Sequence, residues 1–265
     1  MHKRIRKCLI SLMLIFFMSI NTMNVYAEGQ YQETLAVSGF SQAAKVASGA
    51  WFVAEISPVS YRFYTIPVKE AGEIKVIING LTKKNKVTVG LESDYKSVKD
   101  VKAEKPNAVF YVKNPDNYVL SISNYSHNTI QLSYSFTKKE NQGGNSFSKA
   151  AALKKGLKKN GIFGFDTLVN KKQYYKLKIA KEELVKLKVK KGNSCSSKDT
   201  MCVQVYKAND KKHPVTWGYI YEGQSSATLY IRNSENYRTK PGTYYVVASK
   251  MYRDSSFDYS LTWLK

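Results

Sequence analysis

Apolar and polar residues alternate along several short stretches of the chain. Residues 175–179 (YKLKI) and 185–191 (VKLKVKK) place apolar side chains at every second position with lysines between, and residues 130–136 (IQLSYSF) follow the same pattern. A period of two is typical of strands that bury one face and expose the other to water. The pattern predicts an all-β protein of antiparallel β-sandwiches with a jelly-roll-like arrangement.

Four sequence blocks occur twice in the same order, which indicates an internal repeat. The pairs are residues 39–46 and 146–153, 60–68 and 171–179, 110–123 and 229–237, and 130–136 and 257–263. We therefore predict two tandem β-sandwich domains at residues 34–138 and 145–265. Residues 139–144 form a short polar linker that contains glycine.

The segment SFSKAAALKKGLKKNG, residues 146–161, belongs to the first of these blocks. Its apolar residues recur in the first copy, so we interpret them as part of the fold that covers an end or edge of the sandwich. We expect a short helical turn here, with Ser41 or Ser148 as the N-cap. A membrane-binding helix is the competing interpretation, but such a helix needs a longer stripe of bulky apolar residues.

The first 27 residues are typical of a secretory signal peptide. A basic start is followed by an apolar run over residues 9–20, and Val25 and Ala27 then place small residues at a cleavage site. The remaining chain has no apolar run long enough to cross a bilayer. We expect a secreted protein that is extracellular or associated with the cell wall, with no transmembrane segment in its mature form.

Charge separates the two copies more than any other property. The whole chain has a formal net charge of +22, and four of its basic residues lie in the signal peptide. Residues 34–138 hold 13 basic and 8 acidic residues, whereas residues 145–265 hold 24 and 9. Because the copies share a pattern but not a charge, the fold does not require the excess lysines.

These lysines are candidates for binding a polyanion. The candidates are Lys154, Lys155, Lys158, Lys159, Lys176, Lys178, Lys186, Lys188 and Lys190. We expect the last five to line solvent-facing rows on adjacent strands. The alternative is that they only keep a β-protein soluble and block strand addition at its edges.

The second copy resembles the bacterial pre-peptidase C-terminal domain, a β-sandwich often appended to secreted peptidases. The resemblance rests on Ala150 and Ala151, on Gly156, Gly161 and Asp166, and on the segments QYYKLKI, PGTYYVVAS and FDYSLTW. It implies a β-sandwich that serves in targeting, solubility or substrate binding. Some members bind calcium through clustered acidic residues, but Asp166 has no such cluster around it in sequence.

Two cysteines follow the signal peptide, Cys195 and Cys202. Export permits a disulfide, and an even count around a polar loop favours a pair over free thiols. Their spacing, without a nearby histidine, is a poor zinc signal.

Aromatic residues supply a second candidate surface. Trp217, Tyr219 and Tyr221 alternate and are expected to project from one face of a strand. Exposed, they would stack on sugar rings or proline-rich segments; buried, they would fill a sheet's core, and burial is the favoured interpretation. A motif shared by residues 114–118 and 233–237 (N-x-[DE]-N-Y) is expected to form a turn or, alternatively, to line a ligand loop.

No catalytic or cofactor motif stands out. His127 and His213 do not correspond in the repeat and lack metal-ligand spacing, and G-x-S-x-G and a phosphate-binding loop are missing from the sequence. We therefore expect a non-enzymatic binding protein without cofactor or metal. Its second domain would engage an anionic polymer or glycan, such as teichoic acid or a glycosaminoglycan.

The alternative function is a protein-binding adhesin or an accessory module that partners a secreted peptidase or a host matrix protein. Nucleic acid could bind a basic face with tyrosines without sequence preference, but export makes it a less natural target.

Overall fold

The structure is a computed structural model that describes residues 31–33, 44–58, 60–83, 85–93, 96–124, 127–192, 199–232, 238–253 and 255–264. The predicted signal peptide, Ser41, Cys195 and the motif at residues 233–237 lie outside these residues. None of the described residues forms a helix, so none could supply a helical membrane span. The prediction of an all-β fold is confirmed.

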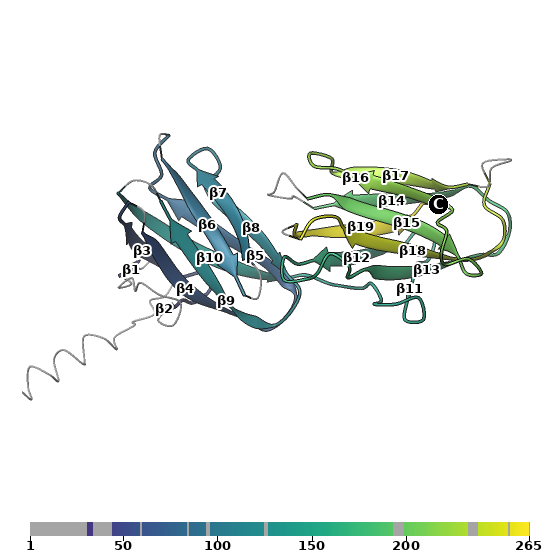
Figure 1. Ribbon diagram of the computed structural model, residues 1–265, viewed down its shortest axis with the longest axis horizontal. Coiled ribbons are helices and arrows are strands. Elements are labelled where there is room, and N and C mark those ends of the chain that lie inside the picture. Colours follow the sequence, from purple (N-terminus) through teal and green to yellow (C-terminus); the bar gives the residue numbers. More distant parts are fainter. Residues whose placement is uncertain are drawn as a thin grey trace, which may run out of the picture.

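The first ten strands form two facing sheets, called here the N-terminal sandwich (Figure 1). They are β1 (Tyr31–Glu33), β2 (Ala44–Lys45), β3 (Trp51–Ile56), β4 (Tyr61–Val68), β5 (Gly72–Asn79), β6 (Lys86–Glu92), β7 (Lys96–Lys102), β8 (Asn107–Val112), β9 (Asp116–Ser123) and β10 (Asn128–Lys138). One sheet has the order β1-β3-β10-β5-β8 and the other β2-β4-β9-β6-β7.

The remaining nine strands form the C-terminal sandwich. They are β11 (Ala151–Ala152), β12 (Lys158–Phe163), β13 (Gln173–Ile179), β14 (Val185–Lys191), β15 (Met201–Lys207), β16 (Thr216–Ile220), β17 (Ser226–Ile231), β18 (Gly242–Lys250) and β19 (Phe257–Trp263). Their sheets have the orders β12-β19-β14-β17 and β11-β13-β18-β15-β16.

The two sandwiches share one topology. The order β3-β10-β5-β8 recurs as β12-β19-β14-β17, and β2-β4-β9-β6-β7 recurs as β11-β13-β18-β15-β16. Pairing is antiparallel except where β1, β2 and β11 run parallel to β3, β4 and β13. The order of strands thus parallels the order of the repeated sequence blocks, while the domain boundaries at residues 34–138 and 145–265 stay a prediction.

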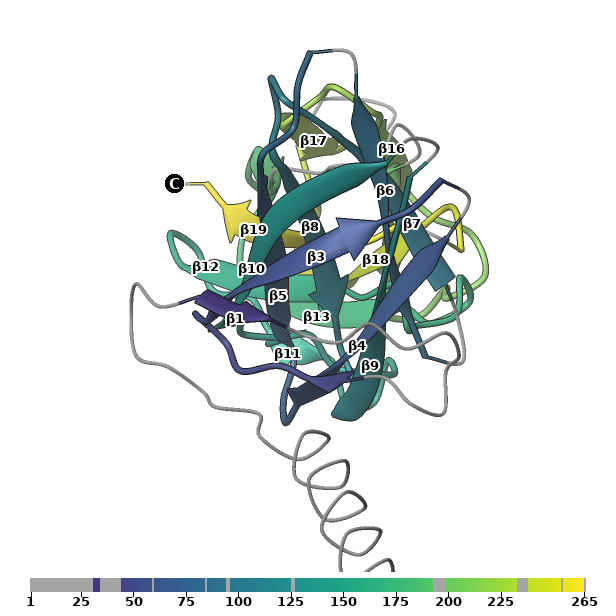
Figure 2. The same cartoon turned by 90° about the vertical axis from the view of Figure 1, so that its left-hand side faces the viewer.

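Each sandwich has its own hydrophobic core, built from the inward positions of alternating strands. In β5, Ile74, Val76 and Ile78 are fully buried, and in β14 Val185 and Leu187 are fully buried. Burial of this apolar surface is the main stabilising term for a sandwich, at roughly 25 cal/mol per Å². Figure 2 looks along the long axis, with the N-terminal sandwich in front.

The helical turn expected around Ser148 is wrong. Residues 151 and 152 instead form β11, parallel to β13, and the amide of Lys149 donates to Oγ of Ser146 at 3.2 Å. Ser146 therefore takes the turn-closing role that we assigned to Ser148. Leu153 is buried in the core, so the apolar pattern here is architectural but not helical.

The segment after β12 inserts into the N-terminal sandwich. Phe165 is 1% exposed and packs in the N-terminal core, where its ring meets Tyr118 edge-on at 5.7 Å. Its amide donates to the carbonyl of Tyr111 at 3.0 Å. A residue of the second sequence copy thus completes the core of the first.

Asp166 anchors the same segment through hydrogen bonds. Its carboxylate accepts from the backbone amides of Lys113 and Asn114, at 2.9 and 2.7 Å. The buried ammonium of Lys250 donates to the carbonyl of Gly164 at 2.9 Å, which holds the start of the segment against β18. The two sandwiches therefore meet through a packed, hydrogen-bonded junction.

The linker is also fixed to the C-terminal sandwich. Gly144 exchanges two backbone hydrogen bonds with Tyr174, of 3.0 and 2.9 Å. A Cβ atom at Gly144 would lie 1.8 Å from the carbonyl oxygen of Lys149, so only glycine fits here. The polar, glycine-containing composition of this segment thus reflects a close backbone approach.

Candidate binding surfaces

The outer face of the sheet β12-β19-β14-β17 carries four of the predicted lysines. Their outward position follows from strand alternation, because the residues between the β14 lysines are buried in the core. We call the side chains of Lys158, Lys186, Lys188 and Lys190 the lysine face.

Hydroxyl side chains flank two of these lysines on both sides. Lys188 lies between Thr262 of β19 and Thr228 of β17 in the sheet register. Lys190 lies in the same way between Ser260 and Ser226. Two consecutive rows across the outer face therefore each hold a lysine between two hydroxyl side chains. Each row offers an anion one positive charge and two hydrogen-bond donors from hydroxyl groups.

The remaining rows extend the lysine face toward its edges. Lys158 pairs with Thr262 from the other side, and the ammonium of Lys186 lies 6.0 Å from the ring centre of Tyr230. Residues two apart on a strand are roughly 6.8 Å apart, so the β14 lysines form a regular line of positive charge.

The expected adjacency of the two lysine-rich strands is wrong. β13, with Lys176 and Lys178, belongs to the sheet β11-β13-β18-β15-β16, whereas β14 belongs to the opposite sheet. Because residues 180–184 carry the chain from one sheet to the other, these two lysines face away from the lysine face. Lys176 pairs with Tyr245 on the outer surface of its own sheet.

The other candidate lysines lie at the rim of the C-terminal sandwich. Lys155 forms an ion pair with Glu183, and its ammonium lies 5.7 Å from the ring centre of Trp263. Lys154 is exposed beside it, and Lys159 pairs with Leu261, on the side of β12 away from the lysine face. The predicted set therefore divides between one face, the opposite face and the rim.

The aromatic row of Trp217, Tyr219 and Tyr221 is exposed, so the interpretation that favoured burial is wrong. The three side chains are 61%, 37% and 55% exposed, and the two tyrosine rings stack at 5.7 Å. They belong to the edge strand β16 and the turn after it. Trp217 and Tyr219 also line an open groove of about 470 Å³ between β16 and β17.

A second aromatic group, which the sequence reasoning missed, surrounds Phe147. Its ring meets Tyr174, Tyr206 and Tyr245 at centroid distances of 4.9, 5.8 and 5.1 Å. The ammonium of Lys211 lies 5.6 Å from the Phe147 ring centre. Phe147 thus covers the outer face of a sheet, and the outward alternation of the tyrosines was the available signal.

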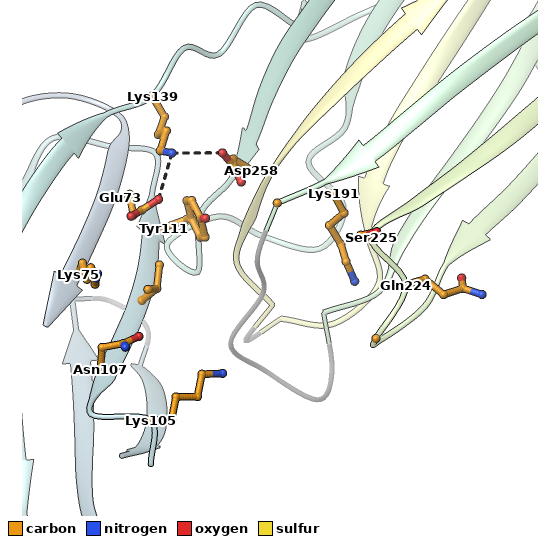
Figure 3. Close-up of a pocket in the computed structure, with 13 residues that line it drawn as sticks. Glu73, Lys75, Lys105, Asn107, Tyr111, Lys139, Lys191, Gln224, Ser225 and Asp258 are labelled. Carbon is orange, nitrogen blue, oxygen red and sulfur yellow. Dashed lines mark ion pairs between the residues drawn. The ribbon is translucent and has the colours of Figure 1, made fainter. Parts of the chain in front are cut away.

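A polar pocket of about 750 Å³ lies where the two sandwiches meet (Figure 3). The N-terminal sandwich and linker contribute Glu73, Lys75, Lys105, Asn107, Val109, Tyr111 and Lys139. The C-terminal sandwich contributes Lys191, Gly192, Gly223, Gln224, Ser225 and Asp258. Sequence reasoning could not find this site because its walls come from strands distant in the chain.

Lys139 joins the two walls of this junction pocket. Its ammonium lies 3.1 Å from a carboxylate oxygen of Glu73 and 3.4 Å from one of Asp258. Burial lowers the pKa of Lys139, but these two carboxylates outweigh it, so the pKa is raised overall. Burial, reinforced by the same carboxylates, also raises the pKa of the Tyr111 hydroxyl.

The pocket holds more positive than negative charge. Its four lysines face two carboxylates, and Lys139 engages both of these carboxylates. Lys191 is buried and donates to the carbonyls of Asp199 and Tyr221, and burial lowers its pKa. Lys75 and Lys105 add further cationic groups on the opposite wall.

The remaining candidate groups show no catalytic arrangement within the described residues. His127 and His213 are exposed, and Nδ1 of His213 lies 3.1 Å from a carboxylate oxygen of Asp210. Within the described ranges no three His, Cys, Asp or Glu side chains gather in a way that would hold a metal ion. Cys202 is buried, and its predicted disulfide partner Cys195 lies outside the described residues.

No protein-family model matches the chain, and no curated protein matches its sequence. Its structure is similar to the pre-peptidase C-terminal domain of a Bacillus anthracis collagenase, as the sequence resemblance predicted. That match has 16% identity and a TM-score of 0.31, and covers 48% of this chain and 98% of that chain.

Two further solved structures are similar at comparable levels. Tripeptidyl peptidase 2 matches at 14% identity and a TM-score of 0.33, over 84% of this chain but only 24% of that chain. A carbohydrate-binding module of the β-sandwich superfamily matches at 9% identity and a TM-score of 0.25, over 80% and 98%. These similarities concern the fold alone.

Proposed function

We propose that this chain is a secreted, non-enzymatic binding protein whose C-terminal sandwich engages an anionic polymer or glycan at the outside of the cell. The lysine face is the binding surface. The observation that carries this function is the repeated row of hydroxyl, lysine and hydroxyl around Lys188 and Lys190.

Repetition is what distinguishes this surface from a solubilising coat. Scattered lysines would serve solubility equally well, whereas a line of charges along β14, flanked by hydroxyl donors, suits a linear ligand with repeated anionic groups. Lys154, Lys176 and Lys178 are not part of this line, which makes them a natural comparison of equal charge.

Binding to immobilised heparin and to purified anionic cell wall, measured across a sodium chloride series, tests the function. The whole chain from Glu28 onward is used, because Phe165 would lose its buried site if the C-terminal sandwich were separated. We expect binding that falls steeply with salt, since salt screens exposed charges. Replacing Lys186, Lys188 and Lys190 by glutamine should move elution to markedly lower salt.

The matched control replaces Lys154, Lys176 and Lys178 by glutamine, which removes the same charge. This control should elute close to the unaltered chain. Equal loss in both triple variants would mean that net charge alone attracts the polymer, and unaltered elution of the lysine-face variant would overturn the proposal.

A further inference from the structure

The lysine face leads directly into the junction pocket. Ser226 and Ser260 flank Lys190 in the sheet register. Ser225, which precedes Ser226, and Asp258, two residues before Ser260, both line the pocket. Gly192 directly follows the end of β14, two residues after Lys190. The outward surface thus continues from the lysine row to the pocket.

Gly192 leaves this passage without a side chain. Its amide donates to the carbonyl of Asp258 at 2.8 Å, and a Cβ atom there would lie 1.6 Å from Oδ1 of Asp258. Any other residue would displace the carboxylate that holds Lys139. The row of lysines on β14 is therefore followed by a residue without a side chain, on the side that faces the N-terminal sandwich.

On the other side of the pocket, the N-terminal sandwich contributes further lysine side chains. Lys75 on β5 and Lys105 before β8 line the far wall of the pocket, opposite Gln224 and Ser225 (Figure 3). Lys139 pairs with both carboxylates of the pocket and Lys191 is buried, so Lys75 and Lys105 are the cations that a ligand would meet.

We propose that the pocket is the continuation of the lysine face, and that one anionic glycan chain binds both sandwiches along a single track. The segment from Lys186 to Gly192 spans roughly 20 Å at 3.4 Å per residue, and the pocket extends it. This inference rests on the proposed function and adds to it that the weakly charged N-terminal sandwich takes part in binding.

The lining of the pocket favours a glycan over a polyanion without hydroxyl groups. Asn107, Gln224 and Ser225 combine donors and acceptors in one cavity. Such groups match the hydroxyls of a sugar ring, whereas the lysines match its anionic substituents.

Binding of heparin oligosaccharides of two lengths tests the track. The unaltered chain should bind a dodecasaccharide more tightly than a tetrasaccharide. Replacing Lys75 and Lys105 by glutamine should weaken dodecasaccharide binding about tenfold, the range expected for lost charged contacts. Tetrasaccharide binding should stay unchanged, because the lysine face is intact.

The matched control replaces Lys45 and Lys102, exposed residues on the N-terminal sheet that does not line the pocket. It should bind both lengths like the unaltered chain. If the Lys75 and Lys105 variant bound the dodecasaccharide as tightly as the unaltered chain does, the track would be overturned, but the lysine face would remain in place. Failure of the lysine-face triple variant to lose binding would instead overturn the proposed function itself.

Inorganic polyphosphate, which has no ring hydroxyls, separates a glycan from a generic polyanion. Asn107→Ala should weaken dodecasaccharide binding and leave polyphosphate binding unchanged. An equal loss for both probes, or no loss for either, would overturn the glycan assignment of the pocket.

Discussion

The carboxylate of Asp166 accepts a hydrogen bond of 3.0 Å from the hydroxyl of Tyr118, across the junction between the two sandwiches. Asp166 follows Phe165, whose ring lies in the core that Tyr118 belongs to. A buried acid whose oxygens are satisfied by backbone amides and a hydroxyl is a costly group to disturb. This contact joins the two sandwiches whose walls form the pocket.

Phe165→Ala should destabilise the whole chain. Phenylalanine-to-alanine changes in a core cost about 3–5 kcal/mol, and here the cavity would open in the N-terminal sandwich although the residue belongs to the second sequence copy. Asp166→Ala should cost about 1–3 kcal/mol, because it leaves buried donors unsatisfied. Urea unfolding followed by circular dichroism measures both changes.

Leu168→Ala is the control for these two variants, since that side chain is exposed in the same segment. It should change the free energy of unfolding by less than about 0.5 kcal/mol. If Phe165→Ala were equally mild, Phe165 would not be part of the N-terminal core.

The sequence was sufficient to predict the class of fold because strand alternation is a local property. It could not predict which sheet a strand joins. Lys178 and Lys186 both alternate with core residues, yet the turn between them takes the chain to the opposite sheet. Outward lysines alternate with core residues in the same way whichever of the two sheets the strand joins.

Sequence patterns could not predict the contacts between the two sandwiches either. From the sequence alone, Phe165 would be assigned to the core of its own copy. The residues around it do not indicate that its ring contacts Tyr118. Trp217 was expected to be buried but is exposed. An edge strand shows the same alternation as an inner strand, so the sequence does not indicate that the aromatic side of β16 is exposed. The junction pocket, formed by both sandwiches, could not be predicted for the same reason.

Gly144→Ala should destabilise the C-terminal sandwich. The new Cβ atom would clash with the backbone carbonyl of Lys149, and relief requires breaking the paired hydrogen bonds with Tyr174. We expect a loss of about 2 kcal/mol or more, as for other backbone strain. Thermal unfolding measures it, with Asn145→Ala as the control because Asn145 is exposed next door. Equal melting temperatures of the two variants would contradict the close approach.

Stability should fall at alkaline pH through a buried tyrosine pair. The hydroxyls of Tyr175 and Tyr259 lie 2.9 Å apart, and Tyr259 donates to Gln173 at 2.8 Å. Burial raises the pKa of Tyr175 to about 12 and raises that of Tyr259 well above its usual value of 10.0. Their contribution is therefore fully present below pH 10, where the unfolded tyrosines are still neutral.

As pH rises from 10 toward 12, the unfolded chain loses protons that the folded chain keeps, so the free energy of unfolding decreases. Urea unfolding at pH 8, 10 and 11 measures the slope. Replacing both tyrosines by phenylalanine should make it shallower, whereas Tyr252→Phe, at an exposed site, should leave it unchanged. A steeper slope in the double variant would contradict the burial effect.

The predicted Cys195–Cys202 disulfide is open to a direct chemical test. In protein exported to an oxidising medium, we expect no free thiol to react with an alkylating reagent, even in urea. A bridge closing so short a loop should contribute about 2–3 kcal/mol, so reduction should lower the urea midpoint. Alkylation of two thiols without reductant would show that Cys202 is only a buried thiol, whose pKa is raised by burial.

Trp217 should report directly on the exposed edge of β16. At 61% exposed it should give red-shifted emission that acrylamide quenches, unlike Trp263, which is 5% exposed. Trp217→Ala should remove that component and change the free energy of unfolding by less than about 0.5 kcal/mol. A large loss of stability would mean that the side chain is packed rather than exposed.

The same variant separates the two candidate functions. Binding through the lysine face is screened by salt, whereas binding of a protein partner through Trp217, Tyr219 and Tyr221 would survive high salt because apolar contacts are not screened. Polyanion binding that is equal for Trp217→Ala and the unaltered chain at every salt concentration is the expected result. Capture of a peptidase or matrix protein at high salt, lost in Trp217→Ala and kept in the lysine-face triple variant, would favour the protein-binding alternative.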